Sequence, residues 1–83
     1  FRNLQLAFDA LNRGGNAPCI INAANEVAVD AFLHDKIHFL DMADIVESCL
    51  TYATFVPSPT YDDYVQSDAE VRRLANERIK SSV

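Results

Sequence analysis

The segment between Asn16 and His34 restricts the fold more than any other feature of the chain, because as a helix it would be apolar on most of its circumference. Its apolar positions follow helical spacing: Ile20, Ile21, Ala23, Ala24, Val27, Ala28, Val29, Ala31, Phe32 and Leu33. The remaining narrow polar strip consists of Asn22, Asn25, Glu26 and Asp30. Such a helix lies at the centre of a bundle or beneath another domain. We therefore predict a central helix from about Asn16–Pro18 to His34.

An amphipathic helix is predicted ahead of it, with one apolar stripe formed by Phe1, Leu4, Phe8 and Leu11 beside Ala7. Gly14 and Gly15 end this helix, since glycine readily adopts the left-handed backbone found after a helix. A glycine turn before a helix could alternatively bind phosphate through free N–H groups. The sequence lacks both the Gly-x-Gly-x-x-Gly and the Gly-Lys-Ser/Thr patterns, and a turn between two helices accounts for both glycines.

Two further helices are predicted in the second half of the chain. After an extended connector at 36–40, Asp41 would cap a third helix, with Leu40 and Ile45 placed as a hydrophobic staple. Its core face comprises Met42, Ile45, Val46, Cys49, Leu50 and Ala53. Pro57 and Pro59 then force a corner.

Two capping-box patterns, Thr60 with Asp63 and Ser67 with Glu70, predict a short helical turn at 61–65 and a last helix from Asp68 to about Lys80. The core face of the last helix comprises Val71, Leu74, Ala75 and Ile79. The expected fold is all-α, a compact antiparallel bundle of about four helices in a single domain spanning 1–83. A chain of 83 residues can bury one core of modest stability, which a partner surface would help.

The composition argues against nucleic acid and membranes as partners. The formal net charge is −5, and the cations gather near the C-terminus at Arg72, Arg73, Arg78 and Lys80, where they suit the helix dipole. The sequence contains no apolar run long enough to span a bilayer. Cys19 and Cys49 stand far apart at apolar helical positions, so two reduced, buried thiols and a reducing compartment are expected.

Several polar groups could carry chemistry, and each also has a structural explanation. His34 and His38 have the spacing of two zinc ligands, but the helix is expected to end between them. The carboxylates Asp62, Asp63, Asp68 and Glu70 could form acid/base or magnesium sites, yet all occupy first turns of predicted helices. We assign no catalytic, cofactor or metal residue.

Asn22, Asn25 and Glu26 are adjacent polar groups in apolar surroundings, and covered polar groups need hydrogen-bond partners. Two amides and a carboxylate without a neighbouring His, Lys or Cys make a poor reaction centre. We expect a structural network that ties this helix to its neighbours or to another domain, with direct substrate contact as the alternative.

The chain resembles the C-terminal part of the 1-deoxy-D-xylulose 5-phosphate reductoisomerase family along essentially its whole length. The most specific part is Asn22-Ala23-Ala24-Asn25-Glu26-Val27-Ala28-Val29, reached through Gly14-Gly15-Asn16-Ala17-Pro18. Ala31-Phe32-Leu33, Ile37-x-Phe39-x-Asp41-Met42 and Asp68-Ala69-Glu70-Val71-Arg72-Arg73-Leu74-Ala75 also match in order and spacing.

The resemblance implies an oxidoreductase of non-mevalonate isoprenoid biosynthesis that converts 1-deoxy-D-xylulose 5-phosphate to 2-C-methyl-D-erythritol 4-phosphate with NADPH and Mg²⁺ or Mn²⁺. It implies a homodimeric parent with a nucleotide-binding domain, a metal-binding catalytic domain and a C-terminal helical domain, located in a bacterial cytoplasm or a plastid. The family's dinucleotide loop, Asp-Ser-Glu metal ligands and Met-Met-Asn-Lys segment have no counterpart here. We therefore expect an excised, non-catalytic domain whose partners are the other domains of its own chain.

A free-standing helical protein-interaction module is the alternative. Such a module would bring its own initiator Met and a polar cover over the central helix, whereas an excised domain would expose an apolar patch where its parent lies. The chain starts at Phe1, which favours the excised domain.

Overall fold

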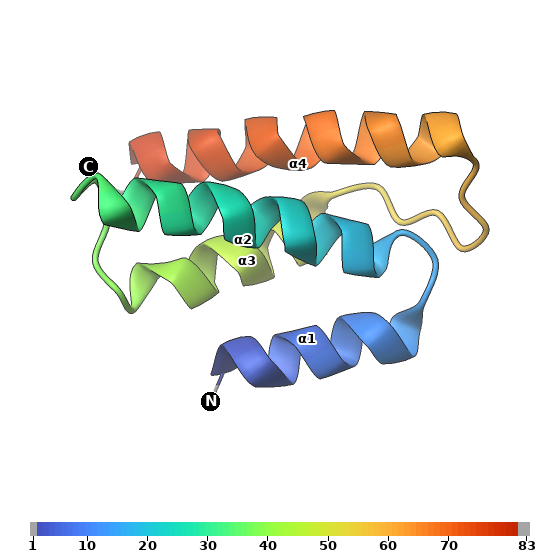
Figure 1. Ribbon diagram of the computed structural model, residues 1–83, viewed down its shortest axis with the longest axis horizontal. Helices are drawn as coiled ribbons and strands as arrows, with labels where there is room; N and C mark the ends of the chain where they lie inside the picture. The colour runs from blue at the N-terminus through green and yellow to red at the C-terminus, as the bar shows by residue number, and fades with distance from the viewer. Residues whose placement is uncertain (1, 82–83) are drawn as a thin grey trace.

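The computed structural model describes residues 2–81, which form four α-helices (Figure 1). They are α1 (Arg2–Arg13), α2 (Ala17–Leu33), α3 (Asp41–Tyr52) and α4 (Tyr61–Ser81). Successive helices run in opposite directions in Figure 1, and the described part of the chain contains no strand. The predicted all-α antiparallel bundle is confirmed. Within residues 2–81, no helix is both long and apolar enough to cross a membrane.

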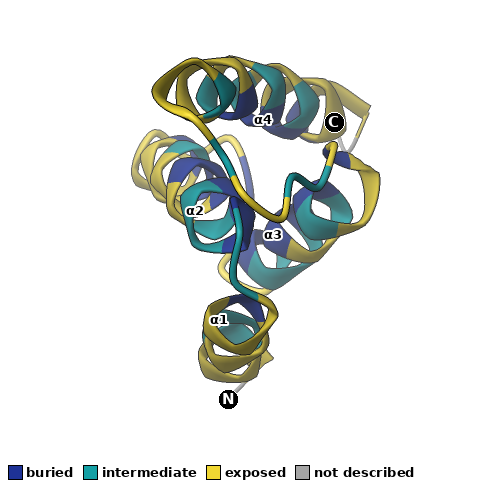
Figure 2. Cartoon of the chain, turned by 90° about the vertical axis from the view of Figure 1, so that its right-hand side faces the viewer, coloured by how far each residue is buried: buried dark blue, intermediate teal, exposed yellow. Residues whose placement is uncertain are grey.

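Helix α2 is central, as predicted, because it packs against all three other helices. Its buried residues are Ala17, Ile20, Ala23, Ala24, Ala28 and Ala31. Small side chains of this kind let neighbouring helices approach closely. The buried faces of α2, α3 and α4 turn toward one another in Figure 2. Val29 and Leu33 remain 36% and 70% exposed, so the apolar surface of α2 is not covered all round.

The predicted core faces of α3 and α4 are confirmed. Both supply the shared core with residues at helical spacing: Met42, Ile45, Val46 and Cys49 from α3, and Val71, Ala75 and Ile79 from α4. Ala53 belongs to the same core, and Leu50 and Leu74 are partly buried against it. The apolar spacing in the sequence thus identifies most of the side chains that form the core between α2, α3 and α4.

Helix α1 lies along one edge of this core, packs Leu6 against it and leaves three other large apolar side chains largely exposed. Leu4, Phe8 and Leu11 are 56%, 56% and 66% exposed. The helix approaches α2 and α3 through Ala10, which is buried, and through Leu6 and Ala7, which are half-buried. The predicted stripe therefore exists, but it does not face this core. Phe1, its first predicted member, lies outside the described residues.

The predicted cap and staple of α3 are wrong. The helix begins at Asp41 itself, and the Asp41 carboxylate accepts a hydrogen bond from the His38 N–H at 2.8 Å instead of binding N–H groups further into the helix. Leu40 is 80% exposed while Ile45 is buried, so the two do not form a staple. The Asp41 carboxylate thus finds its hydrogen-bond partner in the turn that precedes the helix.

Residues 34–40 form a series of turns, which corrects the predicted extended connector. Asp35 has a φ of +58°, and the Lys36 N–H donates to the Ala31 carbonyl at 2.9 Å. A left-handed residue followed by such a bond is a common way to end a helix. Phe39 then packs edge-on against Phe32, with ring centroids 5.8 Å apart. The chain reverses within a short distance as a result.

The predicted break near Ser67 is also wrong, since α4 is continuous from Tyr61 to Ser81. The first capping box is confirmed: the Thr60 N–H donates to the Asp63 carboxylate at 2.9 Å, and the Asp63 N–H donates to the Thr60 hydroxyl at 3.2 Å. Ser67 does not cap a helix because its side chain is buried against Asn16. A buried hydrogen bond replaces the predicted helix start.

Candidate functional site

The polar strip of α2 lies on its exposed side, and one of its members reaches α4. Glu26 is exposed, and its Oε2 lies 3.1 Å from Nη2 of Arg72. The Arg72 Nε also donates to Asp68 Oδ2 at 2.9 Å. Ion pairs this exposed contribute about 0–1 kcal/mol each, so their main effect is to fix the side chains in one arrangement.

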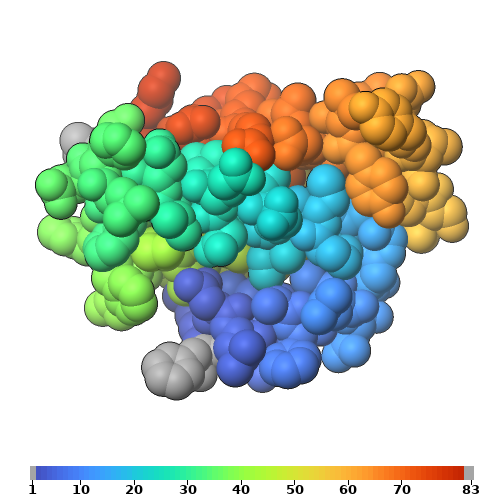
Figure 3. Space-filling view, in the orientation of Figure 1, coloured from blue at the N-terminus to red at the C-terminus, as the bar shows by residue number. Residues whose placement is uncertain are grey.

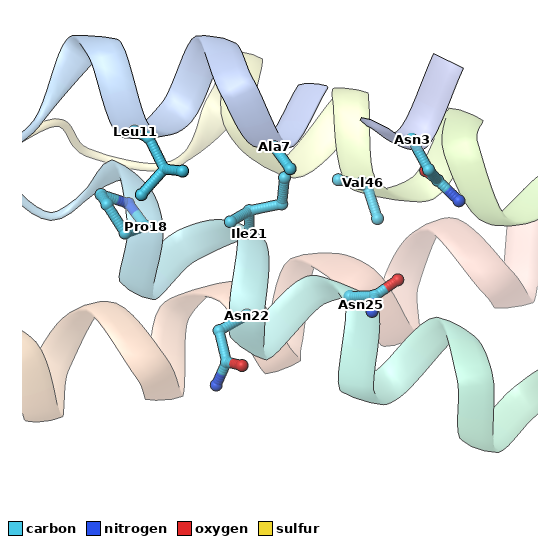
Figure 4. Close-up of a pocket in the computed structure, with 8 residues that line it drawn as sticks. All are labelled: Asn3, Ala7, Leu11, Pro18, Ile21, Asn22, Asn25 and Val46. Carbon is cyan, nitrogen blue, oxygen red and sulfur yellow. The ribbon is translucent and has the colours of Figure 1, made fainter. Parts of the chain in front are cut away.

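Asn22 and Asn25 line a groove of about 350 Å³ between α1 and α2 (Figure 4). The other lining residues are Asn3, Ala7, Leu11, Pro18, Ile21 and Val46. Neither Asn22 nor Asn25 forms a side-chain hydrogen bond within residues 2–81. The Asn3 Oδ1 atom is buried and also has no hydrogen-bond partner among the described residues.

The groove therefore combines an apolar floor with amide groups whose hydrogen-bonding capacity the described residues leave unused. A buried amide oxygen without a partner costs about 1–3 kcal/mol. Asn3 was not singled out by the sequence, because a single Asn at a helical position carries no signal of its burial. The assignment of Asn22, Asn25 and Glu26 to an interdomain network stays a prediction.

A buried amide that the sequence did not reveal as important lies at the start of α2. Asn16 is fully buried, and its Nδ2 donates to the Thr54 carbonyl at 2.9 Å and to the Ser67 hydroxyl at 2.8 Å. Its Oδ1 accepts from the Val56 N–H at 2.8 Å, and its own N–H donates to the Val56 carbonyl at 3.0 Å. Asn16 thus connects the α1–α2 turn, the segment after α3 and the second turn of α4.

The phosphate-loop alternative for Gly14 and Gly15 finds no support in this arrangement. The Asn16 N–H is used by Val56, and the Ala17 N–H donates to the Gly14 carbonyl at 3.0 Å. Gly15 lies against residues 55–57, so that a Cβ there would sit 2.4 Å from the Val56 carbonyl oxygen. The N-terminus of α2 is occupied by the protein's own backbone.

Three of the four carboxylates considered as acid/base or magnesium groups have structural partners. Asp63 caps α4, and Asp68 pairs with Arg72. Glu70 accepts from the Thr54 N–H at 2.6 Å and from the Thr54 hydroxyl at 3.2 Å. Asp62 is exposed on the first turn of α4. Their positions match stabilising roles in the bundle.

The two histidines do not converge. Both are exposed, and the His34 Nδ1 lies 2.8 Å from the backbone oxygen of Asp30, one turn earlier in α2. Among residues 2–81, no three His, Cys, Asp or Glu side chains lie close enough together to hold a metal ion. The zinc alternative therefore has no set of ligands in the described part of the chain.

The two cysteines are free, as predicted, but they differ in burial. Cys49 is 1% exposed, and burial raises the pKa of its thiol to about 11. Cys19 is only half-buried, which corrects the prediction of two buried thiols, and burial also raises its pKa. Cys49 belongs to the core between α3 and α4, where it packs as a small apolar residue.

We expect a thiol reagent at pH 8 to modify Cys19 in the folded chain and to reach Cys49 only when the chain unfolds. Because the folded-state pKa of Cys49 is raised, its thiol favours the folded state below pH 9 and loses that contribution as the pH rises toward about 11. Mass-spectrometric counting of labels, with and without urea, checks the first part. Urea unfolding at pH 8 and pH 11 checks the expected loss of stability with rising pH. Equal labelling of both thiols in the folded chain would contradict the expected protection of Cys49.

Comparison with known proteins identifies the family of the chain. Residues 1–74 match the family model described as the DXP reductoisomerase C-terminal domain. A protein named 1-deoxy-D-xylulose 5-phosphate reductoisomerase from Bacteroides fragilis is 60% identical over 79 residues, which are 95% of this chain and 20% of that protein.

Proteins of the same name show the same coverage in other bacteria. The protein from Bacteroides thetaiotaomicron is 61% identical over 95% of this chain and 20% of its own length, and that from Ralstonia nicotianae is 45% identical over 99% and 21%. The chain thus spans about a fifth of the length of these relatives. It belongs to the DXP reductoisomerase C-terminal domain family.

Proposed function

We propose that this chain is the C-terminal supporting domain of an enzyme that converts 1-deoxy-D-xylulose 5-phosphate to 2-C-methyl-D-erythritol 4-phosphate with NADPH. The observation that carries the proposal is the 60% identity to a reductoisomerase over 95% of the chain. Identity of this degree across all four helices supports a common role for the domain as well as a common fold.

Residues 1–83 form a single domain in this proposal, joined to nucleotide-binding and catalytic domains of the same polypeptide in a homodimeric enzyme. The bacterial sources of the relatives and the −5 net charge support a bacterial cytoplasmic location, with a plastid as the location if the source is a plant or alga. The relatives are about five times as long as this chain, which leaves room for both further domains.

The residues present do not fit a metal or NADPH site. Within the described residues, no group of three metal-ligating side chains lies together, and the N-terminus of α2 is blocked by Val56. Binding of NADPH and of Mg²⁺ or Mn²⁺ is therefore assigned to the other domains of the parent, and no chemical step is derived for these residues.

The role proposed for Asn22, Asn25 and Glu26 is to brace α2. The exposed ion pair between Glu26 and Arg72 of α4 supports this role. Asn22 and Asn25, exposed at the groove beside α1, have their amides available to a neighbouring domain. Direct substrate contact is the less favoured role, because the described residues that line the groove with Asn22 and Asn25 include no His, Lys or Cys.

The proposal is tested by NADPH oxidation, followed by absorbance, for the full-length protein that contains this chain. The substrate is 1-deoxy-D-xylulose 5-phosphate with Mg²⁺ or Mn²⁺, and the isolated 83-residue chain is the control. We expect turnover by the full-length protein and none by the control. An inactive full-length protein would contradict the enzymatic proposal and favour a helical interaction module.

A further inference from the structure

Helix α1 carries an apolar face that the other helices of the bundle leave more than half exposed. Leu4, Phe8 and Leu11 follow one another at spacings of four and three residues, so they lie on one side of the helix. All three are more than half exposed. Helix α1 forms one edge of the molecule in Figure 3, with its outer side turned away from the other three helices. We call these three side chains the α1 face.

Helix α1 buries little side-chain surface against the rest of the bundle, so these contacts stabilise it only weakly. Ala10 is its only buried residue within residues 2–13, and the contacts with α2 and α3 are made by small or half-buried side chains. The ends are held by exposed groups: Arg2 pairs with Asp44 at 2.6 Å, and the Arg13 guanidinium lies 3.9 Å above the ring of Phe55. Helices of this length are marginal in water unless an apolar face is packed.

The α1 face continues into the groove beside it. Leu11 belongs to both, and Figure 4 shows its side chain pointing toward Pro18 at one end of the groove. Ile21 continues the apolar floor, while Asn22 and Asn25 lie along the side of α2. The combined surface offers apolar contact along α1 and unused amide groups along α2. An occupant must therefore present apolar side chains together with hydrogen-bonding groups.

We propose that the α1 face and the adjoining groove form the docking site for the part of the parent polypeptide that precedes Phe1. Two observations point to this occupant. The family match makes this chain a C-terminal domain, so in relatives about five times as long the missing sequence lies largely before it. In addition, α1 is the first helix, so the preceding sequence is joined directly to the uncovered face.

Covalent attachment also favours this occupant over a second copy of the chain. A segment tethered by a short linker has an effective concentration on the order of millimolar at its docking site. A second copy would have to reach a comparable concentration in solution. The apolar surface at Tyr61 and Val65 on α4 lies on a helix that does not touch α1 within residues 2–81, and it serves as a matched control.

This inference rests on the proposed function only in taking the chain as one domain of a longer polypeptide. It adds the surface through which the domain is attached. It also places α4, on the far side of α2, away from that attachment.

The experiment uses the full-length protein with a photo-crosslinking aromatic residue, p-benzoylphenylalanine, in place of Phe8, and a second variant with the same residue in place of Tyr61. Each is prepared in normal and in ¹⁵N-labelled form, the two forms are dissociated and reassembled together so that subunits mix, and cross-linked peptides are identified by mass spectrometry. We expect the variant with p-benzoylphenylalanine at position 8 to cross-link to peptides that precede Phe1 in the sequence. The two linked peptides should carry the same isotope, because the α1 face would lie in an interface core with its own chain. The yield should exceed that of the Tyr61 variant by at least about tenfold, since only the core of an interface is fully desolvated.

A yield at position 8 no higher than at position 61 would overturn the inference, and so would cross-links of mixed isotope, which would make a second copy the occupant. A measurement on the unmodified protein guards against a folding defect in the variant. Hydroxyl-radical footprinting should oxidise Phe8 at least about tenfold more slowly than Tyr61 if the α1 face is covered in an interface core. Comparable oxidation of the two rings would also overturn it.

Failure of this inference can be told apart from failure of the proposed function. Intrachain cross-links in a protein that does not oxidise NADPH would retain the docking surface and reject the reaction. NADPH oxidation by a protein whose Phe8 is freely oxidised would retain the reaction and reject the docking surface.

Discussion

Replacement of Asn16 by alanine should lower the free energy of unfolding by about 3 kcal/mol, because buried groups left without hydrogen bonds cost about 1–3 kcal/mol each. The substitution would remove both bonds made by the Asn16 Nδ2 atom and the bond accepted from the Val56 N–H. The Thr54 carbonyl and the Val56 N–H would lose their partners in a partly buried place. Urea unfolding followed by circular dichroism measures the change.

Ser67→Ala is the matched control for this network. It removes one bond, and the Asn16 Nδ2 atom keeps the Thr54 carbonyl as its acceptor. A cost of about 1 kcal/mol is expected, the usual net value of one hydrogen bond. If Asn16→Ala costs no more than Ser67→Ala, the segment at 54–56 is not held by Asn16.

Gly15→Ala should destabilise the chain by about 3 kcal/mol or more, since left-handed backbone costs a non-glycine residue about 1–2 kcal/mol and a steric overlap is added. Gly15 has a φ of +55°, and an added Cβ would lie 2.4 Å from the Val56 carbonyl oxygen and 2.9 Å from the Pro57 Cα. Both contacts are with backbone, which cannot rotate away. Thermal unfolding of the variant and of the original chain provides the comparison.

Gly14→Ala separates the two causes. Gly14 also has a left-handed backbone, with a φ of +72°, but a Cβ there would meet no atom within 4 Å. Only the backbone penalty of about 1–2 kcal/mol should appear. Equal effects of the two substitutions would show that the close approach of residues 55–57 to Gly15 is not maintained in solution.

The helices could be predicted because their apolar periodicity is strong and local. Ile45 and Cys49 on α3, like Val71 and Ala75 on α4, have the helical spacing of a core face and are buried. Errors occurred where a long-range contact overrode a local pattern. The Ser67 hydroxyl matches a capping box in sequence, yet it is used by Asn16, 51 positions away, and no local rule can foresee that pairing.

The outward direction of the α1 stripe could not be predicted for a related reason. Periodicity identifies Leu4 and Phe8 as members of one face but not what that face meets. In this structure the stripe stays more than half exposed, because α1 approaches α2 and α3 mainly through Leu6, Ala7 and Ala10. The importance of Asn16 was missed similarly: an Asn ahead of a helix usually suggests a cap, and only the folded chain reveals its three partners.

The sequence predicts no catalytic residue in this chain, both from the positions of its carboxylates and from the family resemblance, and this stays a prediction. Asp63, Asp68 and Glu70 are engaged in capping, an ion pair and a loop contact. His34, His38 and Asp62 are the remaining candidates for proton transfer, and all three are exposed.

The most direct test of a supporting, non-catalytic domain is steady-state NADPH oxidation by the full-length protein carrying His34→Ala, His38→Ala and Asp62→Asn together. We expect a kcat within about twofold of the unmodified protein, since removal of a general acid or base would cost about 10²–10⁴-fold. Unchanged thermal unfolding would show that the variant is folded. A loss of kcat of about 100-fold or more in the folded variant would contradict a non-catalytic role and place catalysis partly in this domain.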